Sequence, residues 1–231
     1  MYLLKPGQTI TLGHTISRYS KGGETYDSKT QRLKELDSKR REAVFTAALN
    51  VFGRDGYRRA HTEEIAHRSG VSKGLLFYYF SNKQDLYLQT AEWLIARMER
   101  LIVDDAYMSI DDFFELILHL NDRSRAVFDK YPRCIDFSLA LFYADASSST
   151  GAWLAAWCER IAPRYFAHVR RERFREEDGM RRAIEMLIWL SDGWLHQHRL
   201  VDGPLDSQRL CDEIPAWCEM LRSWLYKEEF R

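Results

Sequence analysis

The sequence predicts an all-α protein. Apolar residues recur at intervals of three and four along almost the whole chain after residue 36, and the alternation typical of β-strands is never sustained. Only five prolines occur in 231 residues, and 45% of the residues are hydrophobic, which is enough for one large core or two modest ones. At this point one large helical domain and two modest ones are both open.

A polar segment precedes the helices. From Met1 to about Leu36 the residues Gly, Ser, Thr and Lys are scattered without a period. The segment holds six basic and three acidic residues, so a mobile arm here could add weak contacts to phosphates. The alternative is a disordered extension with no role of its own.

The amino-terminal domain, residues 37–83, is expected to contain three helices. The first ends at Gly56, because glycine readily adopts the left-handed conformation of a helix cap. The second stops at Gly70. The third is followed by Ser81 and Asn82, both good N-caps for a longer fourth helix. We expect these four helices over residues 38–54, 62–69, 73–80 and 83–103.

The carboxyl-terminal domain, residues 84–231, is expected to be helical throughout. Apolar periods, capping residues and prolines set the limits of its helices, with a kink at Pro163 in the longest one. No repeat of fixed period occurs, so a solenoid is not expected. The helices are predicted over about 110–131, 133–146, 150–177, 180–200 and 207–230.

Charge is divided unevenly along the chain, although its formal net charge is zero. Residues 1–83 contain 15 Lys and Arg against 8 Asp and Glu, a net of +7, whereas residues 84–231 contain 19 against 26, a net of −7. The amino-terminal third is therefore the part suited to an anionic partner.

The chain has no segment that could span a membrane and no secretory signal. Its longest stretch without charge, residues 146–158, has 13 residues, against roughly 20 needed for a span. The start lacks the basic, apolar and small-residue regions of a signal peptide. The four cysteines form no CxxC pair and are interpreted as core residues in a reducing compartment. We expect a cytoplasmic protein without a membrane partner.

The stretch Gly70-Val71-Ser72 suits a tight turn between two helices. Glycine takes the positive φ, valine fills the angle between the helices, and serine caps the second helix. With Leu76 and Phe80 facing inward, the rest of this helix is left for solvent or a ligand. A DNA major groove accepts one such helix, and the phosphates beside it would meet the lysines that flank it, Lys73 and Lys83.

The segment "RREAVFTAALNVFGRDGYRRAHTEEIAHRSGVSKGLLFYYFSNKQDLYLQTAEWL", roughly residues 39–94, resembles the DNA-binding domain of the tetracycline-repressor (TetR) family. Its features occur in order: "AALNVFGRDGY", "EEIAHRSGVSKG", "YYF" and "NKQDL". The resemblance implies that Lys73 and Tyr78 contact base edges and that Tyr79 and Lys83 contact phosphates. The full set of DNA-binding candidates is Thr62, Ser72, Lys73, Gly74, Leu75, Phe77, Tyr78, Tyr79 and Lys83.

Two positions depart from the family pattern. Leu75 stands where Thr or Ser is frequent, which favours an apolar contact, such as one with thymine methyl groups. His61 stands at the usual Thr or Ser cap, so either His61 or Thr62 begins the second helix. For Phe77 and Tyr79 the alternative to DNA contact is packing against the first helix.

The resemblance also implies that the carboxyl-terminal helices form a homodimer and enclose a small-molecule site. Apolar stripes on the last two helices fit a four-helix interface, and an ordinary core within one chain is the alternative. Aromatic residues of this larger domain could line a pocket for an apolar or amphipathic effector, or could simply fill the core. The dimer candidates are Leu187, Leu190, Ser191, Trp194, Trp217, Leu221 and Trp224. The pocket candidates are Trp93, Phe114, Phe137, Phe142, Trp157, Phe166 and Trp189.

Neither a metal nor a cofactor is expected. His196 and His198 point about 200° apart on a helix and cannot readily share one metal. The run "RRERFREED", residues 170–178, is interpreted as a salt-bridged helix end, with binding of a phosphate-bearing effector as the alternative.

Three functions are compared. The first is a homodimeric repressor of transcription that binds a palindromic operator on double-stranded DNA and is released by an effector. The second is a DNA-binding protein whose output is a protein contact without a small-molecule ligand. The third is an enzyme, which we reject because the chain contains no G-x-S-x-G, P-loop or zinc signature.

Overall fold

Helices make up nearly all regular structure in the computed structural model, which describes residues 38–145, 147–160, 162–201 and 207–231. The expected arm over residues 1–36 lies outside these ranges. Within them no strand occurs, so the all-α prediction is confirmed. The α-helices are α2 (Ser38–Arg59), α3 (Thr62–Ser69), α4 (Lys73–Tyr79), α5 (Lys83–Ile102), α6 (Asp105–Ser109), α7 (Phe113–Lys130), α8 (Cys134–Phe142), α9 (Ser149–Arg160), α10 (Ala162–Tyr165), α11 (Gly179–Val201) and α12 (Ser207–Leu225). The 3-10 helices are η1 (Arg171–Arg173) and η2 (Glu228–Phe230).

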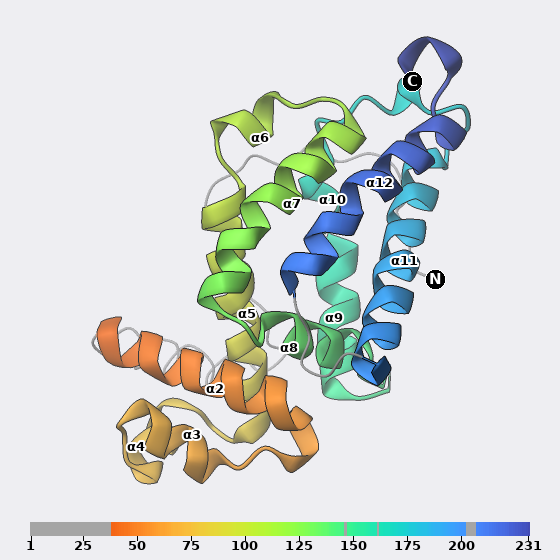
Figure 1. Ribbon diagram of the computed structural model, residues 1–231. Coiled ribbons are helices and arrows are strands. Elements are labelled where there is room, and N and C mark those ends of the chain that lie inside the picture. The colour runs from red at the N-terminus through yellow and green to blue at the C-terminus, as the bar shows by residue number, and fades with distance from the viewer. Residues whose placement is uncertain (1–37, 146, 161, 202–206) are drawn as a thin grey trace.

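Helices α2, α3 and α4 lie together at one end of the molecule, and α5 leads from them into the larger bundle (Figure 1). The helical geometry of α2 breaks at Gly56, which has φ 72° and ψ 168°. This is the break that the sequence predicts, although one short turn continues to Arg59. The buried face of α2 packs against α3, α5 and α8, so the small domain shares its core with the bundle.

Helix α5 begins immediately after the short helix α4. The Asn82 side chain accepts a hydrogen bond from the Asp85 amide at 2.9 Å and so caps the helix as predicted. Leu86, Tyr87 and Leu94 are buried on its inner face, and Tyr87 stacks edge-on against Phe52 of α2. Only Phe80, Ser81 and Asn82 separate α4 from α5, so the two helices are joined by a short connection.

The helix predicted over residues 150–177 is wrong. Helix α9 ends at Arg160, α10 ends at Tyr165, and the chain then turns back across the bundle. Long-range contacts direct this turn: the Arg170 amide donates to the Asp111 carbonyl at 2.9 Å, and Phe174 forms an isolated bridge with Tyr226. Residues 170–178 are therefore salt-bridged, as expected, but are not a helix end.

Other helix limits differ less. Helix α6 was not predicted; Asp104 caps it by accepting from the Tyr107 amide at 2.8 Å. The helix predicted to reach residue 230 ends at Leu225, because Tyr226 is fully buried and pairs with Phe174. Cys134, Cys211 and Cys218 are free and buried, which confirms their predicted core role. No helix in the described ranges is long and apolar enough to cross a bilayer.

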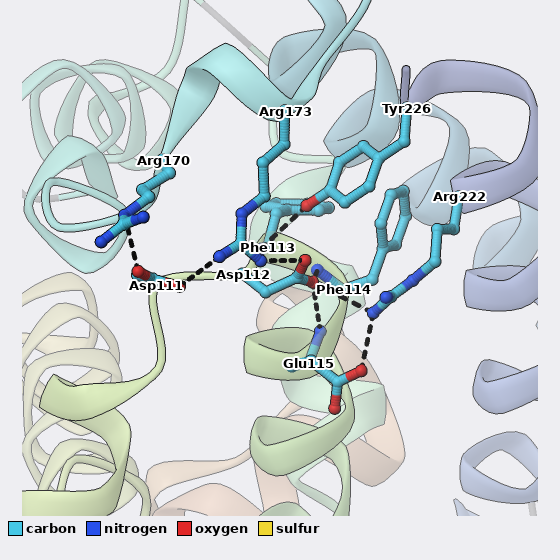
Figure 2. A network of polar contacts seen from close by, with 9 residues as sticks. All are labelled: Asp111, Asp112, Phe113, Phe114, Glu115, Arg170, Arg173, Arg222 and Tyr226. Carbon is cyan, nitrogen blue, oxygen red and sulfur yellow. Dashed lines mark hydrogen bonds and ion pairs between the residues drawn. The ribbon is translucent and has the colours of Figure 1, made fainter. Parts of the chain in front are cut away.

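The start of α7 and the end of α12 lie at the end of the bundle remote from α4 (Figure 1), and a polar network joins them there (Figure 2). The Asp112 carboxylate caps α7 by accepting from the amides of Phe114 and Glu115 at 2.9 and 3.0 Å. It also binds Arg173 at 2.6 Å and Arg222 at 3.0 Å. Since its side chain is only 8% exposed, this one carboxylate joins α7, η1 and α12. The arginines proposed for a phosphate effector are partly used here, because Arg170 and Arg173 pair with Asp111.

Candidate nucleic-acid interface

The turn between α3 and α4 has the geometry that its sequence predicts. Gly70 adopts the left-handed conformation, with φ 70° and ψ 22°, which a residue with a side chain rarely adopts. Val71 packs against the core, and its amide donates to the Ala66 carbonyl at 3.0 Å. The Ser72 hydroxyl accepts from the Leu75 amide at 3.1 Å and caps α4.

Helix α4 presents one face to the core and the other to solvent. Leu76 and Phe80 are each 1% exposed, which confirms that they face inward. Tyr78 is 48% exposed, and Lys73 and Gly74 are exposed beside the Ser72 cap. The solvent face of α4 therefore carries the ammonium group of Lys73 and the phenol of Tyr78. At Gly74 it also offers backbone that a ligand can approach closely, because glycine has no side chain.

The three remaining candidates on α4 are half-buried. Leu75, Phe77 and Tyr79 belong to this class, and Tyr79 packs against the core while its ring meets that of Tyr78 edge-on at 5.1 Å. Each of these side chains is therefore partly covered by the protein and can be reached by a ligand at its exposed part.

The lysine at the start of α5 points toward the protein. Lys83 Nζ donates to the Arg58 carbonyl at 3.1 Å and lies 5.0 Å from the centre of the Tyr57 ring. Burial lowers the pKa of Lys83. The side chain therefore fastens the end of α2 to the start of α5, in addition to any contact with a phosphate.

The start of α3 has no side-chain cap. His61 is the N-cap residue but makes no capping hydrogen bond, and Thr62 is the first helical residue. Thr62 is 8% exposed, and its hydroxyl donates to Glu63 at 3.4 Å. Because the His61 side chain does not cap α3, the backbone amides of this first turn lie where an acceptor such as a phosphate oxygen could meet them.

Two acidic residues of α3, Glu63 and Glu64, form ion pairs that were not predicted from the sequence. Glu63 pairs with Lys73 across the turn. Glu64 accepts from Arg54 at 2.8 Å and from Arg68 at 2.7 Å. The spacing of four between Glu64 and Arg68 signals a helical ion pair. No local spacing signals the other two pairs, because their partners are ten residues apart.

Besides its apolar packing, α2 meets the larger domain at two places that bear on how the domains are joined. At one, Glu42 forms an ion pair with Arg97 of α5 and accepts from the Tyr131 hydroxyl at 2.9 Å. At the other, Gly53 lies so close to Arg133 that an added Cβ would be 2.8 Å from the Arg133 carbonyl oxygen. A side chain at this position would push α2 and α8 apart.

An open groove lies beside the second contact, between α2, α8 and α11. Its volume is about 790 Å³, and both domains contribute to its walls. Its walls combine charged and apolar residues, and the groove was not anticipated from the sequence. The lining residues are Gly53, Arg54, Asp55, Gly56, Arg59, Arg133, Asp136, Leu139, Ala140, Tyr143, Asp192, Gly193, Leu195 and His196.

The aromatic residues expected to line an effector pocket are not brought together. Trp93 and Phe137 belong to the core shared with α2, whereas Phe114 and Phe166 belong to a second core around α7, α11 and α12. Trp157 is half-buried, with its ring 6.3 Å from that of Tyr165. Phe142 and Trp189 are 51% and 66% exposed and line no interior.

The dimer candidates divide between core and surface. Leu187 and Leu221 are 8% and 1% exposed and pack inside their own chain. Trp224 is 59% exposed, and Ile188 and Trp189, which were not dimer candidates, are 49% and 66% exposed on α11. Helices α11 and α12 lie side by side (Figure 1). The remaining candidates are half-buried: Leu190, Ser191, Trp194 and Trp217.

The fold and this surface define a helix-turn-helix protein, and comparison with known proteins identifies its class as transcriptional regulators. The family described as bacterial regulatory proteins, tetR family, matches residues 44–90. The HTH-type transcriptional regulator BetI of Agrobacterium fabrum is 29% identical over 175 residues, covering 74% of this chain and 82% of that protein. The HTH-type transcriptional activator FasR of Mycolicibacterium smegmatis is 32% identical over 100 residues, covering 39% and 46%.

Solved structures share the fold over most of the chain. The SmeT–triclosan complex has a TM-score of 0.58 at 20% identity, covering 84% of this chain and 95% of that one. A TetR-family transcriptional regulator from Chloroflexus aurantiacus has a TM-score of 0.57 at 17% identity, covering 86% and 98%. The tetR family description thus matches the helix-turn-helix segment, and the chain as a whole shares the fold of solved TetR-family structures.

Proposed function

We propose that the protein is a homodimeric, ligand-responsive repressor of transcription that binds a palindromic DNA site. The observation that carries the proposal is helix α4, whose inner face is buried at Leu76 and Phe80 while Lys73, Gly74 and Tyr78 face solvent. A capped, protruding helix of this kind fits the DNA major groove.

Charge supports binding to DNA at this surface. The described residues 38–83 contain nine Lys and Arg against four Asp and Glu, a net of +5. Lys73 and the uncapped amides of α3 lie where phosphates or base edges would meet a helix-turn-helix. Tyr78 supplies the largest exposed side chain for reading base edges.

A second copy of the chain is the partner that we assign to α11 and α12. Ile188, Trp189 and Trp224 leave large apolar area exposed on these two helices, which is costly unless another surface covers it. A two-fold pairing of both helices would cover this area and place two copies of α4 on one side of the dimer. The spacing of the two reading helices would then select half-sites one DNA turn apart.

Effector release would act through the junction between the domains. Helix α5 has 20 residues and is therefore about 30 Å long. Only three residues connect it to α4, so a small change in its tilt alters the distance between the two reading helices. The complex of SmeT with triclosan shows that this fold can hold a small apolar molecule in another protein.

One observation favours the second candidate function, in which a protein contact replaces the small molecule. The aromatic residues proposed for a pocket are divided between two cores and the surface. A metabolite screen by thermal shift distinguishes the two functions, because only the ligand-responsive protein gains stability from a metabolite.

A gel-shift titration with DNA from upstream of the protein's own gene tests DNA binding, with Tyr78→Ala as the variant. We expect a salt-dependent specific complex, and we expect Tyr78→Ala to weaken it about tenfold without changing Tm, because Tyr78 is exposed. Absence of any specific complex at every salt concentration, or wild-type affinity in the variant, contradicts the proposal.

A further inference from the structure

Glu63 and Lys73 form an ion pair across the helix-turn-helix turn. Glu63 is the second residue of α3, Lys73 is the first residue of α4, and Glu63 Oε1 lies 2.5 Å from Lys73 Nζ. Their side chains are 60% and 55% exposed. Since exposed ion pairs contribute little to stability, the fold does not depend on this pair.

The position of the pair places a carboxylate in the proposed DNA interface. In helix-turn-helix proteins the start of the second helix contacts base edges and the first helix crosses the phosphate backbone. The pair spans these two positions. The Lys73 hydrogen bond lowers the pKa of Glu63, so the carboxylate is charged at neutral pH. It therefore repels phosphates on every duplex and neutralises the cation closest to them.

A base pair in the major groove can compensate for this repulsion. Guanine presents two acceptors, N7 and O6, and its partner cytosine presents the N4 amine as a donor. Lysine pairs with the guanine edge and glutamate with the cytosine amine. An ammonium beside a carboxylate thus matches both bases of one G·C pair.

We propose that Glu63 is a specificity-determining residue: together with Lys73 it reads one G·C pair in each half-site, and elsewhere it keeps Lys73 from binding phosphates. This inference rests on the proposed DNA-binding function. It assigns Glu63 to the recognition of one G·C pair in each half-site. Glu63 weakens binding to unrelated DNA more than it weakens binding to the operator. It therefore increases the ratio of the two affinities.

The neighbouring residue supplies a matched control. Glu64 pairs with Arg54 and Arg68 and has no contact with α4 among the described residues. Glu63→Gln and Glu64→Gln change the net charge by the same amount on the same helix. Only the first removes the carboxylate that faces Lys73, so the comparison separates local from overall charge.

The first measurement is fluorescence anisotropy on a duplex of random sequence between 50 and 200 mM salt. We expect Glu63→Gln to bind this duplex about five- to tenfold more tightly near 0.1 M salt, because Lys73 gains a phosphate contact. The slope of log affinity against log salt should steepen by about 0.9 for the same reason.

The second measurement is selection of binding sites from a randomised duplex library. Wild type and Glu64→Gln should enrich a fixed G·C pair in each half-site, and Glu63→Gln should lose this preference by about tenfold. An unchanged slope and preference in Glu63→Gln, or an equal loss in Glu64→Gln, would overturn the inference. If wild type binds no duplex at any salt concentration, the proposed function itself fails.

Discussion

The two ends of the carboxyl-terminal domain are built in different ways. At the end remote from α4, Asp112 caps a helix and binds two arginines, and Figure 2 shows these contacts converging on one carboxylate. At the end that faces α2, Glu42 pairs with Arg97, but Arg97 Nε is buried without a hydrogen-bond partner in the described residues. An open groove of about 790 Å³ lies beside the other contact at this end.

The difference indicates which end is fixed and which can move. A fully satisfied, buried network resists rearrangement, whereas an unsatisfied donor and an open groove lower the cost of changing the contact. Helix α4, the proposed DNA-reading helix, is attached at the less satisfied end. We infer that the remote end acts as a rigid frame and that the junction with α2 is the part that would change in the proposed response to a ligand.

Asp112→Ala should have the largest effect on stability. It leaves two largely buried arginines without their carboxylate and removes a helix cap, so we expect a loss of about 3 kcal/mol in the free energy of unfolding. Urea unfolding measures this loss. The control, Arg170→Ala, removes an ion pair whose arginine is 60% exposed and should leave the midpoint nearly unchanged. Equal losses in both variants would show that the frame is not centred on Asp112.

Gly53→Ala should disturb the junction between α2 and α8. The new Cβ would lie 2.8 Å from the Arg133 carbonyl oxygen, and a backbone atom cannot move away without shifting the helix. We expect a loss of about 1 to 3 kcal/mol in unfolding free energy and weaker DNA binding. Gly193→Ala is the control, because nothing lies within 4 Å of its added Cβ. A fully stable Gly53→Ala protein would contradict the close approach.

Glu92→Gln tests the middle of α5 through pH. Burial raises the pKa of Glu92, repulsion from Asp85 adds to this, and the Trp153 hydrogen bond at 3.3 Å opposes it. The folded state therefore holds a proton above the usual glutamate range, and stability falls as pH rises through the raised pKa. We expect Glu92→Gln to raise Tm at pH 7 and to have less effect at pH 4.

Differential scanning calorimetry at the two pH values measures the change, with exposed Glu219→Gln as the control. If the gain in Tm is the same at both pH values, Glu92 is not held in its neutral form by burial.

Glu42→Gln should have the smallest effect on overall stability. The Glu42 and Arg97 side chains are 30% and 32% exposed, so loss of the pair should change Tm little. Hydrogen exchange should nevertheless become faster near the contact of α2 with α5 and α7, since the Tyr131 hydroxyl and Arg97 both lose a charged acceptor. If amide hydrogen exchange in α2 stays at the wild-type rate, the contact between α2 and the larger domain is not easily rearranged.

Local chemistry explains why the small domain could be predicted closely. Gly70 fixes a left-handed turn, Ser72 caps α4, and Asn82 caps α5, so each boundary depends on residues within a few positions. The segment after Tyr165 has no such signal. Its turn depends on Asp111 and Tyr226, which are more than 50 residues away in sequence, and a helical pattern of apolar residues cannot reveal those contacts.

The candidate sites also divide into those set by local sequence and those set by contacts between distant residues. The outward face of α4 was predictable because two inward residues, Leu76 and Phe80, fix its orientation. The pairing of Glu63 with Lys73 depends on the angle between two helices and was missed. The sequence could not show whether Trp189 and Trp224 are exposed or buried in the single chain. An apolar stripe has the same period whether it packs within the chain or against a second copy.

Native mass spectrometry of the protein on a duplex enriched from a random library tests whether a dimer binds DNA. We expect two protomers on one duplex, with a two-fold symmetric site whose half-sites are about 34 Å apart. A single protomer bound to an asymmetric site, or no enriched duplex, would contradict this expectation.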